Sequence, residues 1–225
     1  AENIADAKAI VEGAKNAGVK LATGHIERFN PVVYYAKLAI ESGKWGKVIS
    51  ISAKRVSRYP SRIKDVGVIY DLAIHDLDII RYLADSEVQD INASGGSIES
   101  SEGREDHASL ILKFKNGIIG TSETSWLTPL KVREMVITCT KAYVTMDFMS
   151  QKIKVMSSTI DAEDSNLFHV SQDVKSKEIE IEKKEPLKIE LLNFLGAVAG
   201  QEEMLVSGVE GLEVVKLAQK AVKQI

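Results

Sequence analysis

Hydrophobic positions recur along the chain with two spacings, one typical of helices and one typical of strands. Apolar residues three and four positions apart predict helices over residues 3–17, 31–42, 186–200 and 209–225, and a central helix within residues 65–84. Gly18 and Gly43 follow the first two helices and are typical C-terminal stops. Helices are therefore expected at both ends of the chain, and the central helix within residues 65–84 lies in its first half.

Alternating and β-branched stretches predict strands between these helices. The predicted strands cover residues 19–24, 48–57, 88–94, 107–114, 118–125, 132–139, 142–148, 152–156 and 178–182. Short turns such as Lys115-Asn116-Gly117 and Thr140-Lys141 favour hairpins, and hairpins in series predict an antiparallel meander. The helix at 3–17 followed at once by the strand at 19–24 resembles half of a parallel α/β unit. The expected fold class is α+β: a large, mostly antiparallel open sheet with helices mainly on one face, preceded by the last unit of an α/β domain.

The central stretch 65–84 places polar side chains inside an otherwise apolar helix. Asp71 and His75 are four residues apart and Asp78 follows His75 by three, so all are expected on one helix face. An imidazole flanked by carboxylates is expected to titrate near neutral pH and to exchange a proton with a substrate. Two alternatives stay open. His75 could be a core side chain hydrogen-bonded by the aspartates, with Asp78 paired to Arg81, or the three residues could bind a metal.

A second polar cluster follows the predicted strand at 19–24. Residues just beyond the carboxyl ends of parallel strands line ligand crevices, which makes His25, Glu27, Arg28 and Asn30 candidates. Asn30 is also expected to cap the helix that starts at Pro31. The cap and a ligand role for Arg28 are compatible.

The loop at residues 57–67 carries Arg58, Arg62 and Lys64 immediately before the central helix. Such cations could hold an anionic substrate. A solvated polar loop explains the same charges equally well.

Composition excludes some classes of function. The chain has 225 residues, 44% hydrophobic and 27% charged, with a net charge of −3 and no Lys/Arg tract, which disfavours nucleic-acid binding. The single cysteine, Cys139, suits a reducing cytoplasm. No apolar run reaches membrane-spanning length, no signal peptide is visible, and no Gly-rich dinucleotide fingerprint occurs. Because the chain starts without Met and inside a helical pattern, we expect a fragment, a processed form or a shortened form of a longer protein.

Three segments together resemble one family. They are HIERFNP at 25–31, YDLAIHDLDIIRYL at 70–83 and SGVEGLEVVKLAQKA at 207–221. In order and spacing they are similar to the glucose–fructose oxidoreductase, inositol dehydrogenase and MocA-like (Gfo/Idh/MocA) family. The resemblance implies an NAD- or NADP-dependent dehydrogenase of sugars, cyclitols or nucleotide sugars, cytoplasmic, with an N-terminal Rossmann domain and a C-terminal domain that forms dimers or tetramers through an open sheet.

The resemblance also implies roles for single residues. His75 matches the catalytic histidine and Asp71 its acidic partner, while Arg28 and Asn30 match a motif near the nicotinamide. A lean toward UDP-sugar members would give Arg58, Arg62 and Lys64 a diphosphate to bind, and no metal is expected. Residues 1–28 would be the remnant of the Rossmann domain and 29–225 the substrate domain. Because the family's fingerprint and its Glu-Lys-Pro motif lie upstream, we expect no turnover by this chain alone. The alternative is a sugar-sensing or assembly module of the same fold.

Overall fold

The computed structural model describes all residues except 61–62, 64, 101–102 and 160–172. Its helices are α1 (Ile4–Asn16), α2 (Pro31–Glu41), α3 (Ile74–Ala84), α4 (Pro186–Val198) and α5 (Gly208–Val222), with a 3-10 turn η1 (Ile26–Phe29) and a π-helical turn η2 (Ile69–Ala73). Its strands are β1 (Val48–Arg58), β2 (Val88–Gly96), β3 (His107–Phe114), β4 (Ile119–Ser125), β5 (Leu127–Cys139), β6 (Tyr143–Asp147), β7 (Lys152–Thr159) and β8 (Asp173–Ile179).

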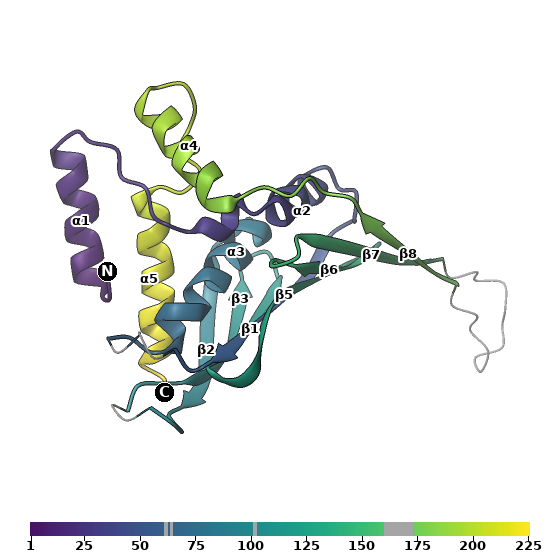
Figure 1. Ribbon diagram of the computed structural model, residues 1–225, viewed down its shortest axis with the longest axis horizontal. Helices are drawn as coiled ribbons and strands as arrows, with labels where there is room; N and C mark the ends of the chain where they lie inside the picture. The colour runs from purple at the N-terminus through teal and green to yellow at the C-terminus, as the bar shows by residue number, and fades with distance from the viewer. Residues whose placement is uncertain (61–62, 64, 101–102, 160–172) are drawn as a thin grey trace.

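The strands form one open sheet in the order β2-β3-β4-β1-β5-β6-β7-β8 (Figure 1). Neighbouring strands are antiparallel except β1 and β4, which are parallel. The α+β class and the mostly antiparallel open sheet are therefore confirmed. The simple meander is wrong, because β1 lies between β4 and β5. Local turn signals could not reveal this insertion, since β1 pairs with residues far away along the chain.

Several predicted strands differ from the structure; β5, for example, starts at Leu127 rather than at residue 132. Residues 19–24 form only one isolated bridge, between Ala22 and Ser207, rather than a strand. Their backbone is held instead by α5, because Gly208 donates to the carbonyl of Leu21 at 2.9 Å. The strand predicted at 178–182 is β8, which starts earlier, at Asp173, and ends at Ile179. It is an edge strand, as its alternating charges indicated.

Side-chain caps define where three helices begin. Asn3 accepts a hydrogen bond from the backbone of Asp6, Asn30 from Val32, and Ser207 from Glu210. Pro31 occupies the first turn of α2, where a missing N–H costs nothing. The cap at Asn30 confirms that expectation, and it fixes the direction in which the chain leaves η1.

The core lies between the sheet and the helices on one of its faces. Ile51, Leu77, Ile80, Phe114 and Ile137 are among its fully buried side chains. Helix α3 approaches β4 closely at Gly120, where a Cβ atom would lie 2.6 Å from Cγ2 of Ile80. A side chain at Gly120 would push α3 off the sheet, so this glycine sets the depth at which the central helix sits.

Figure 1 shows α1 and α5 side by side, with α2, α3 and α5 on the same side of the sheet, as expected. Exposed side chains on the opposite face of the sheet include Lys54, Ile111 and Glu123.

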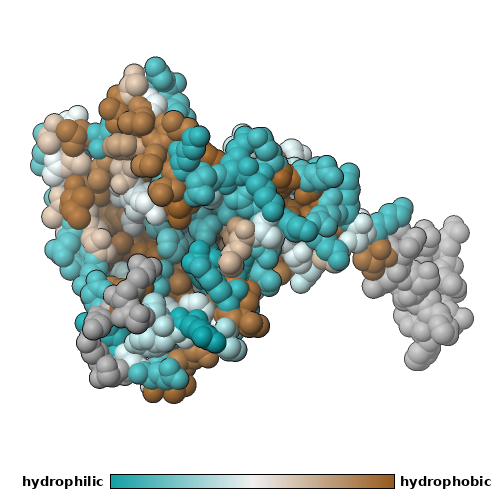
Figure 2. Space-filling model, in the orientation of Figure 1, coloured by the Kyte–Doolittle hydropathy of each residue, from teal (hydrophilic) through white to brown (hydrophobic). Residues whose placement is uncertain are grey.

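Helix α4 exposes apolar residues, which Figure 2 shows as a brown surface at the top of the view. Within the described residues, no helix combines the length and apolar character that crossing a membrane requires.

Candidate functional site

The central stretch begins with a π-helical turn and continues as a regular α-helix. Asp71 lies in η2, and His75 follows in the first turn of α3. Glu105 holds the start of this turn, because its Oε1 accepts from the backbone N–H of Ile69 at 3.2 Å and its carbonyl accepts from Val68 at 2.9 Å. Single π-helical turns are frequently found at functional sites.

Asp71 is held by a tryptophan from the sheet. Nε1 of Trp126, a residue just before β5, donates to Oδ2 of Asp71 at 3.2 Å. Trp126 is 2% exposed, and the ring of Tyr59 packs edge-on against it with centroids 5.2 Å apart. The carboxylate of Asp71 is partly exposed, so one oxygen is fixed by the indole while the group still faces outward.

His75 is partly exposed, and its Nδ1 is buried with no hydrogen-bond partner among the described residues. Burial, with the positive charges of Arg55 and Arg133 and the nearby His25, lowers the pKa of His75 to about 3. The expectation that it titrates near neutral pH is therefore wrong. Of the two carboxylates that were expected to keep the ring basic, Asp78 pairs with Arg28 and Asp71 accepts from Trp126, while the charges of Arg55 and Arg133 act on the ring.

The buried cation nearest this chemistry is Arg55 of β1. Its Nε donates to Oδ1 of Asp76 at 2.8 Å, and its Nη1 to Oε1 of Glu27 at 2.9 Å. Asp76 also accepts from Ser122 at 3.1 Å. The remaining Nη2 of Arg55 is buried without a partner in the described part of the chain. This network ties the sheet, the central helix and η1 together beneath His75.

Arg28 forms a second buried network. Its Nε and Nη2 donate to the two oxygens of Asp78 at 2.8 and 2.7 Å, and its Nη2 also donates to Glu210 at 2.6 Å. The guanidinium lies 4.8 Å from the centre of the Tyr82 ring. Asp78 thus pairs with Arg28 rather than with His75 or with Arg81. The cofactor role of Arg28 stays a prediction, with its guanidinium engaged within the fold.

Asn30 contacts the same region from the cap of α2. Its Nδ2 donates to Oε2 of Glu27 at 3.2 Å and to the carbonyl of Phe148 at 3.1 Å. These bonds hold η1 against the sheet. The cofactor role of Asn30 stays a prediction. Because Asn30 is 2% exposed, it would contribute to a cofactor site by positioning the backbone of η1.

Two buried polar atoms next to Gly24 have no partner among the described residues. They are Nε2 of His25 and Oε1 of Glu190 on α4. Burial lowers the pKa of His25 and raises that of Glu190. A Cβ atom on Gly24 would meet only Oε1 of Glu190, at 4.0 Å, so there is space beside this backbone. Buried polar atoms without partners indicate a site that water or a ligand completes.

The loop cations are only partly visible. Arg58 is exposed at the end of β1, paired across the sheet with Leu127. Arg62 and Lys64 lie outside the described residues. Of the three cations predicted to bind substrate, Arg58 is therefore the one within the described residues. It directly precedes Tyr59, the residue that packs against Trp126.

Sequence reasoning missed Arg55, Trp126 and Arg133. One signal was available for Arg55: a charged residue at a position where the alternation of β1 calls for a buried side chain. The same signal was available for Arg133, which alternates with the buried Met135 and Ile137 on β5. Trp126 carried no such signal, because its partner Asp71 comes from a distant segment.

A metal site at Asp71, His75 and Asp78 was the third interpretation. In the described part of the chain, no three His, Cys, Asp or Glu side chains are grouped so that they could hold a metal ion. Asp78 is instead engaged by Arg28, and Asp71 by Trp126.

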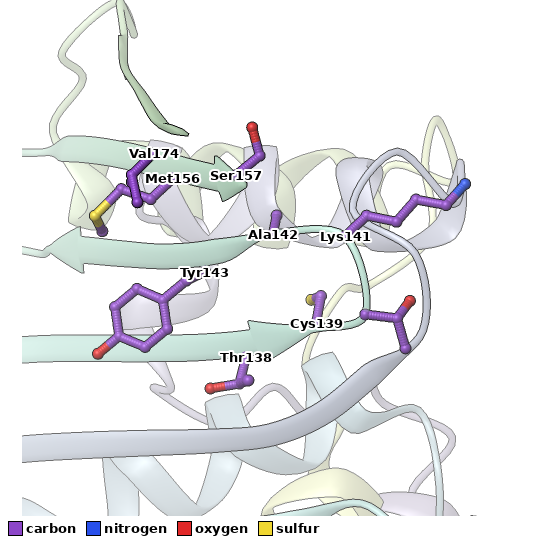
Figure 3. Close-up of a pocket in the computed structure, with 9 residues that line it drawn as sticks. Thr138, Cys139, Lys141, Ala142, Tyr143, Met156, Ser157 and Val174 are labelled. Atoms are coloured by element: carbon purple, nitrogen blue, oxygen red, sulfur yellow. The ribbon is translucent and has the colours of Figure 1, made fainter. Parts of the chain in front are cut away.

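A separate hollow of about 360 Å³ lies over the far end of the sheet (Figure 3). Cys139 is one of its lining residues, and burial raises the pKa of this thiol to about 11. Figure 3 shows Lys141 directed away from the other labelled side chains. The described residues that line this hollow include no carboxylate and no imidazole side chain, so the candidate residues are those around His75.

A family model matches about half of the chain. The family model described as the GFO/IDH/MocA C-terminal domain matches residues 33–145. The chain belongs to the Gfo/Idh/MocA family, and the matched region contains the central helix with Asp71 and His75. The family resemblance drawn from the three segments is therefore confirmed.

Two curated relatives are dehydrogenases. UDP-N-acetylglucosamine 3-dehydrogenase of Acidithiobacillus ferrooxidans is 26% identical over 216 residues, which are 95% of this chain and 64% of that enzyme. Myo-inositol 2-dehydrogenase of Thermotoga maritima is 34% identical over 131 residues, 55% of this chain and 39% of that enzyme. The chain therefore spans less than two thirds of the length of these relatives.

Solved structures share the fold. The A. ferrooxidans UDP-N-acetylglucosamine 3-dehydrogenase GnnA superposes with a TM-score of 0.83 at 24% identity, covering 99% of this chain and 67% of that one. The WlbA dehydrogenase of Bordetella pertussis, solved with NADH and UDP-GlcNAcA, gives a TM-score of 0.77 at 20% identity, covering 100% and 66%. At these identities the likeness defines the fold alone.

Proposed function

We propose that this chain is the substrate-binding portion of an NAD(P)-dependent oxidoreductase that transfers hydride between nicotinamide and a sugar, cyclitol or nucleotide sugar. The observation that carries the proposal is a neutral imidazole, His75, one helical turn from a carboxylate, Asp71, that an indole holds in place. Its relatives by sequence include a nucleotide-sugar dehydrogenase and an inositol dehydrogenase.

In this proposal His75 accepts the proton of the substrate hydroxyl. Its pKa of about 3 keeps the imidazole neutral at physiological pH, which is the form that can accept a proton. Asp71 accepts a hydrogen bond from a hydroxyl of the same substrate, and Trp126 keeps its carboxylate in that orientation. Orientation of the reacting hydroxyl is a large part of what such a site contributes.

The residues around Gly24 fit one end of a nicotinamide cofactor. His25 and Glu190 offer buried polar atoms that have no hydrogen-bond partner among the described residues, which suit a carboxamide group, and Gly24 leaves room beside the backbone. Arg28 and Asn30 would serve this site by fixing η1. When bound, NAD or NADP supplies the hydride acceptor. Nothing we find in the described residues would hold the rest of the dinucleotide, so we propose that the chain is inactive without a cofactor domain.

The substrate we favour is a UDP-sugar. Arg58 is exposed beside the Trp126–Tyr59 pair, and Arg62 and Lys64 follow it in the chain. Together the three cations would bind the diphosphate. The similarity over 95% of the chain to a UDP-N-acetylglucosamine 3-dehydrogenase supports this choice.

We further propose that the chain forms a dimer or tetramer through the open face of the sheet. Ile111 is 52% exposed there, next to Thr121 on β4. An exposed apolar side chain on the sheet face opposite α3 suits contact with a second sheet. A cytoplasmic location, expected from the single cysteine, stays a prediction.

The decisive test is nicotinamide reduction by the longer protein that contains this chain, assayed with a panel of UDP-sugars, neutral sugars and inositols. His75→Ala should lower the hydride-transfer rate about 100-fold or more, because general-base catalysis is worth about that factor, while cofactor affinity is unchanged. His107→Ala, on the opposite face of the sheet, is the matched control and should stay active. Equal rates for His75→Ala and the wild type would defeat the assignment. Sugar binding without any nicotinamide dependence would favour the sensing module.

A further inference from the structure

Arg133 of β5 lies directly opposite Arg55 of β1 in the antiparallel register. Both side chains lie on the sheet face that carries α3, as do their buried neighbours Ala53 and Met135. Two like charges directly opposite one another repel. The pairing is tolerated because Glu27 reaches between them from η1.

Glu27 does not serve the two arginines equally. Its Oε1 lies 2.9 Å from Nη1 of Arg55 but 3.8 Å from Nη1 of Arg133. Arg55 additionally holds Asp76, and Oε2 of Glu27 accepts from Asn30. Among the described residues, the one ion-pair contact of the Arg133 side chain is therefore this long one to Glu27. Its side chain is 34% exposed, and burial together with Arg55 lowers its pKa, which marks an incompletely compensated cation.

Arg133 also lies close to the proposed reacting groups. Its positive charge is one of those that lower the pKa of His75, and the carboxylate of Asp71 attracts it. The partly exposed guanidinium of Arg133, the carboxylate that Trp126 holds and the imidazole of His75 therefore lie within electrostatic reach of one another. A vicinal diol or an acylamino alcohol presents both donors and acceptors, which matches this set of groups.

We propose that Arg133 binds substrate, donating hydrogen bonds to an oxygen substituent on the sugar carbon next to the hydroxyl that His75 deprotonates. This inference rests on the proposed function and deepens it by naming a residue that determines specificity. Asp71 accepts from the neighbouring hydroxyl, so the two residues of opposite charge fix which carbon faces the nicotinamide. Arg55 stays a buried structural residue.

A purely structural Arg133 would act as a counter-ion for Glu27. The geometry disfavours this, since Glu27 already has Arg55 at 2.9 Å and Asn30 at 3.2 Å. Loss of the Arg133 guanidinium would leave no acceptor of this network unpaired. The variants Arg133→Gln and Arg133→Lys should therefore fold with nearly wild-type stability.

The experiment compares the accepted sugar with each of its monodeoxy analogues, using kcat/KM of the wild type, Arg133→Gln and Arg133→Lys in the longer protein. At one position the wild type should disfavour the deoxy analogue by about tenfold or more, since a hydrogen bond to a charged group is lost. Arg133→Gln should abolish that discrimination at this position alone, and Arg133→Lys should keep part of it. Lys113→Gln, on the other face of the sheet, is the matched control.

The outcomes separate this inference from the function itself. If the wild type is active and Arg133→Gln discriminates between the sugar and every deoxy analogue as the wild type does, the role of Arg133 is overturned. The proposed dehydrogenase function is then kept. Absence of nicotinamide reduction with every sugar overturns the proposed function. In that case calorimetry measures the dissociation constants of the sugar and of each deoxy analogue. Equal ratios of these constants for the wild type and Arg133→Gln reject the site, and so does the absence of binding.

Discussion

Arg28 and Asp78 form a two-pronged ion pair across 50 residues of sequence, with nitrogen–oxygen distances of 2.8 and 2.7 Å. Both side chains are almost fully buried, at 4% and 1% exposure. The pair joins η1 to the central helix, and Glu210 extends it to α5. It also links the two sides of the domain boundary predicted at residue 28, so residues 1–28 are tied there to the rest of the chain.

Breaking this pair should destabilise the fold strongly. Asp78→Asn leaves Arg28 buried beside a neutral amide, and removal of one partner of a buried ion pair costs about 3–5 kcal/mol. Urea unfolding followed by circular dichroism measures the free energy of unfolding. The double variant Arg28→Met/Asp78→Leu is the control and should recover much of the loss, because both members of the buried pair are removed and Glu210, whose side chain is 38% exposed, still has Arg81 at 3.8 Å. A loss below about 1 kcal/mol for Asp78→Asn would contradict the structural role.

Trp126 should matter for catalysis more than for stability. Trp126→Phe keeps most of the ring packing but removes the N–H that donates to Asp71, so we expect a roughly tenfold loss in kcat/KM, the value of about one hydrogen bond to a charged group. The matched control is Trp45→Phe. Trp45 is equally buried and its Nε1 has no partner among the described residues, so this change should leave kcat/KM unaltered. Equal effects of the two substitutions would reject a specific role for the indole of Trp126.

His75 should make stability depend on pH. Its pKa falls from the usual 6.5 to about 3 in the folded chain, so between these values the unfolded state binds a proton that the folded state does not. The stabilisation is fully present above pH 6.5 and is lost as pH falls toward 3, with a slope of about 1.4 kcal/mol per pH unit.

The difference between wild type and His75→Gln isolates this contribution. Unfolding free energies measured at several pH values should show a steeper decline for wild type below pH 6.5. The His75 ring signals in an NMR titration should stay those of the neutral form down to about pH 4. Protonation of His75 near pH 6 would show that the surrounding cations do not act on it as the structure indicates.

The cations before the central helix should discriminate between charged and neutral substrates. Arg58→Ala, and the combined change of Arg62 and Lys64, should raise KM for a phosphate-bearing sugar by about tenfold, the value of a charge-assisted hydrogen bond. KM for a neutral sugar should stay the same. Steady-state kinetics with both substrate types measures this, and an equal rise for both would assign the loop another role.

The open face of the sheet should control assembly. Ile111→Glu places a charge on this face and should shift the chain toward monomers in analytical ultracentrifugation. Ile98→Glu introduces the same charge at an even more exposed position outside the sheet, where Ile98 is 73% exposed, and should not change the mass. A wild-type monomer at all concentrations would remove the assembly proposal.

The centre of the candidate site could be predicted from the sequence because it lies within one continuous helical stretch. Asp71 and His75 share a short stretch, and their spacing alone brings them to neighbouring positions. The cap at Asn30 and the hairpin at Asn116-Gly117 were equally local, and the structure contains both. The wrong inferences were those that needed a partner from elsewhere. Asp78 was placed beside His75, yet a residue 50 positions away forms its ion pair.

The sequence by itself determined the α+β class, the extent of most helices and strands, the family and the two residues at the centre of the proposed chemistry, because each depends on periodicity or on short motifs. Only the tertiary structure decided that β1 enters between β4 and β5, that Trp126 holds Asp71, and that Arg55 and Arg133 surround His75. The physical reason is that strand order, ion pairing and pKa depend on which distant side chains share a low-dielectric space, and a linear pattern does not specify those distances.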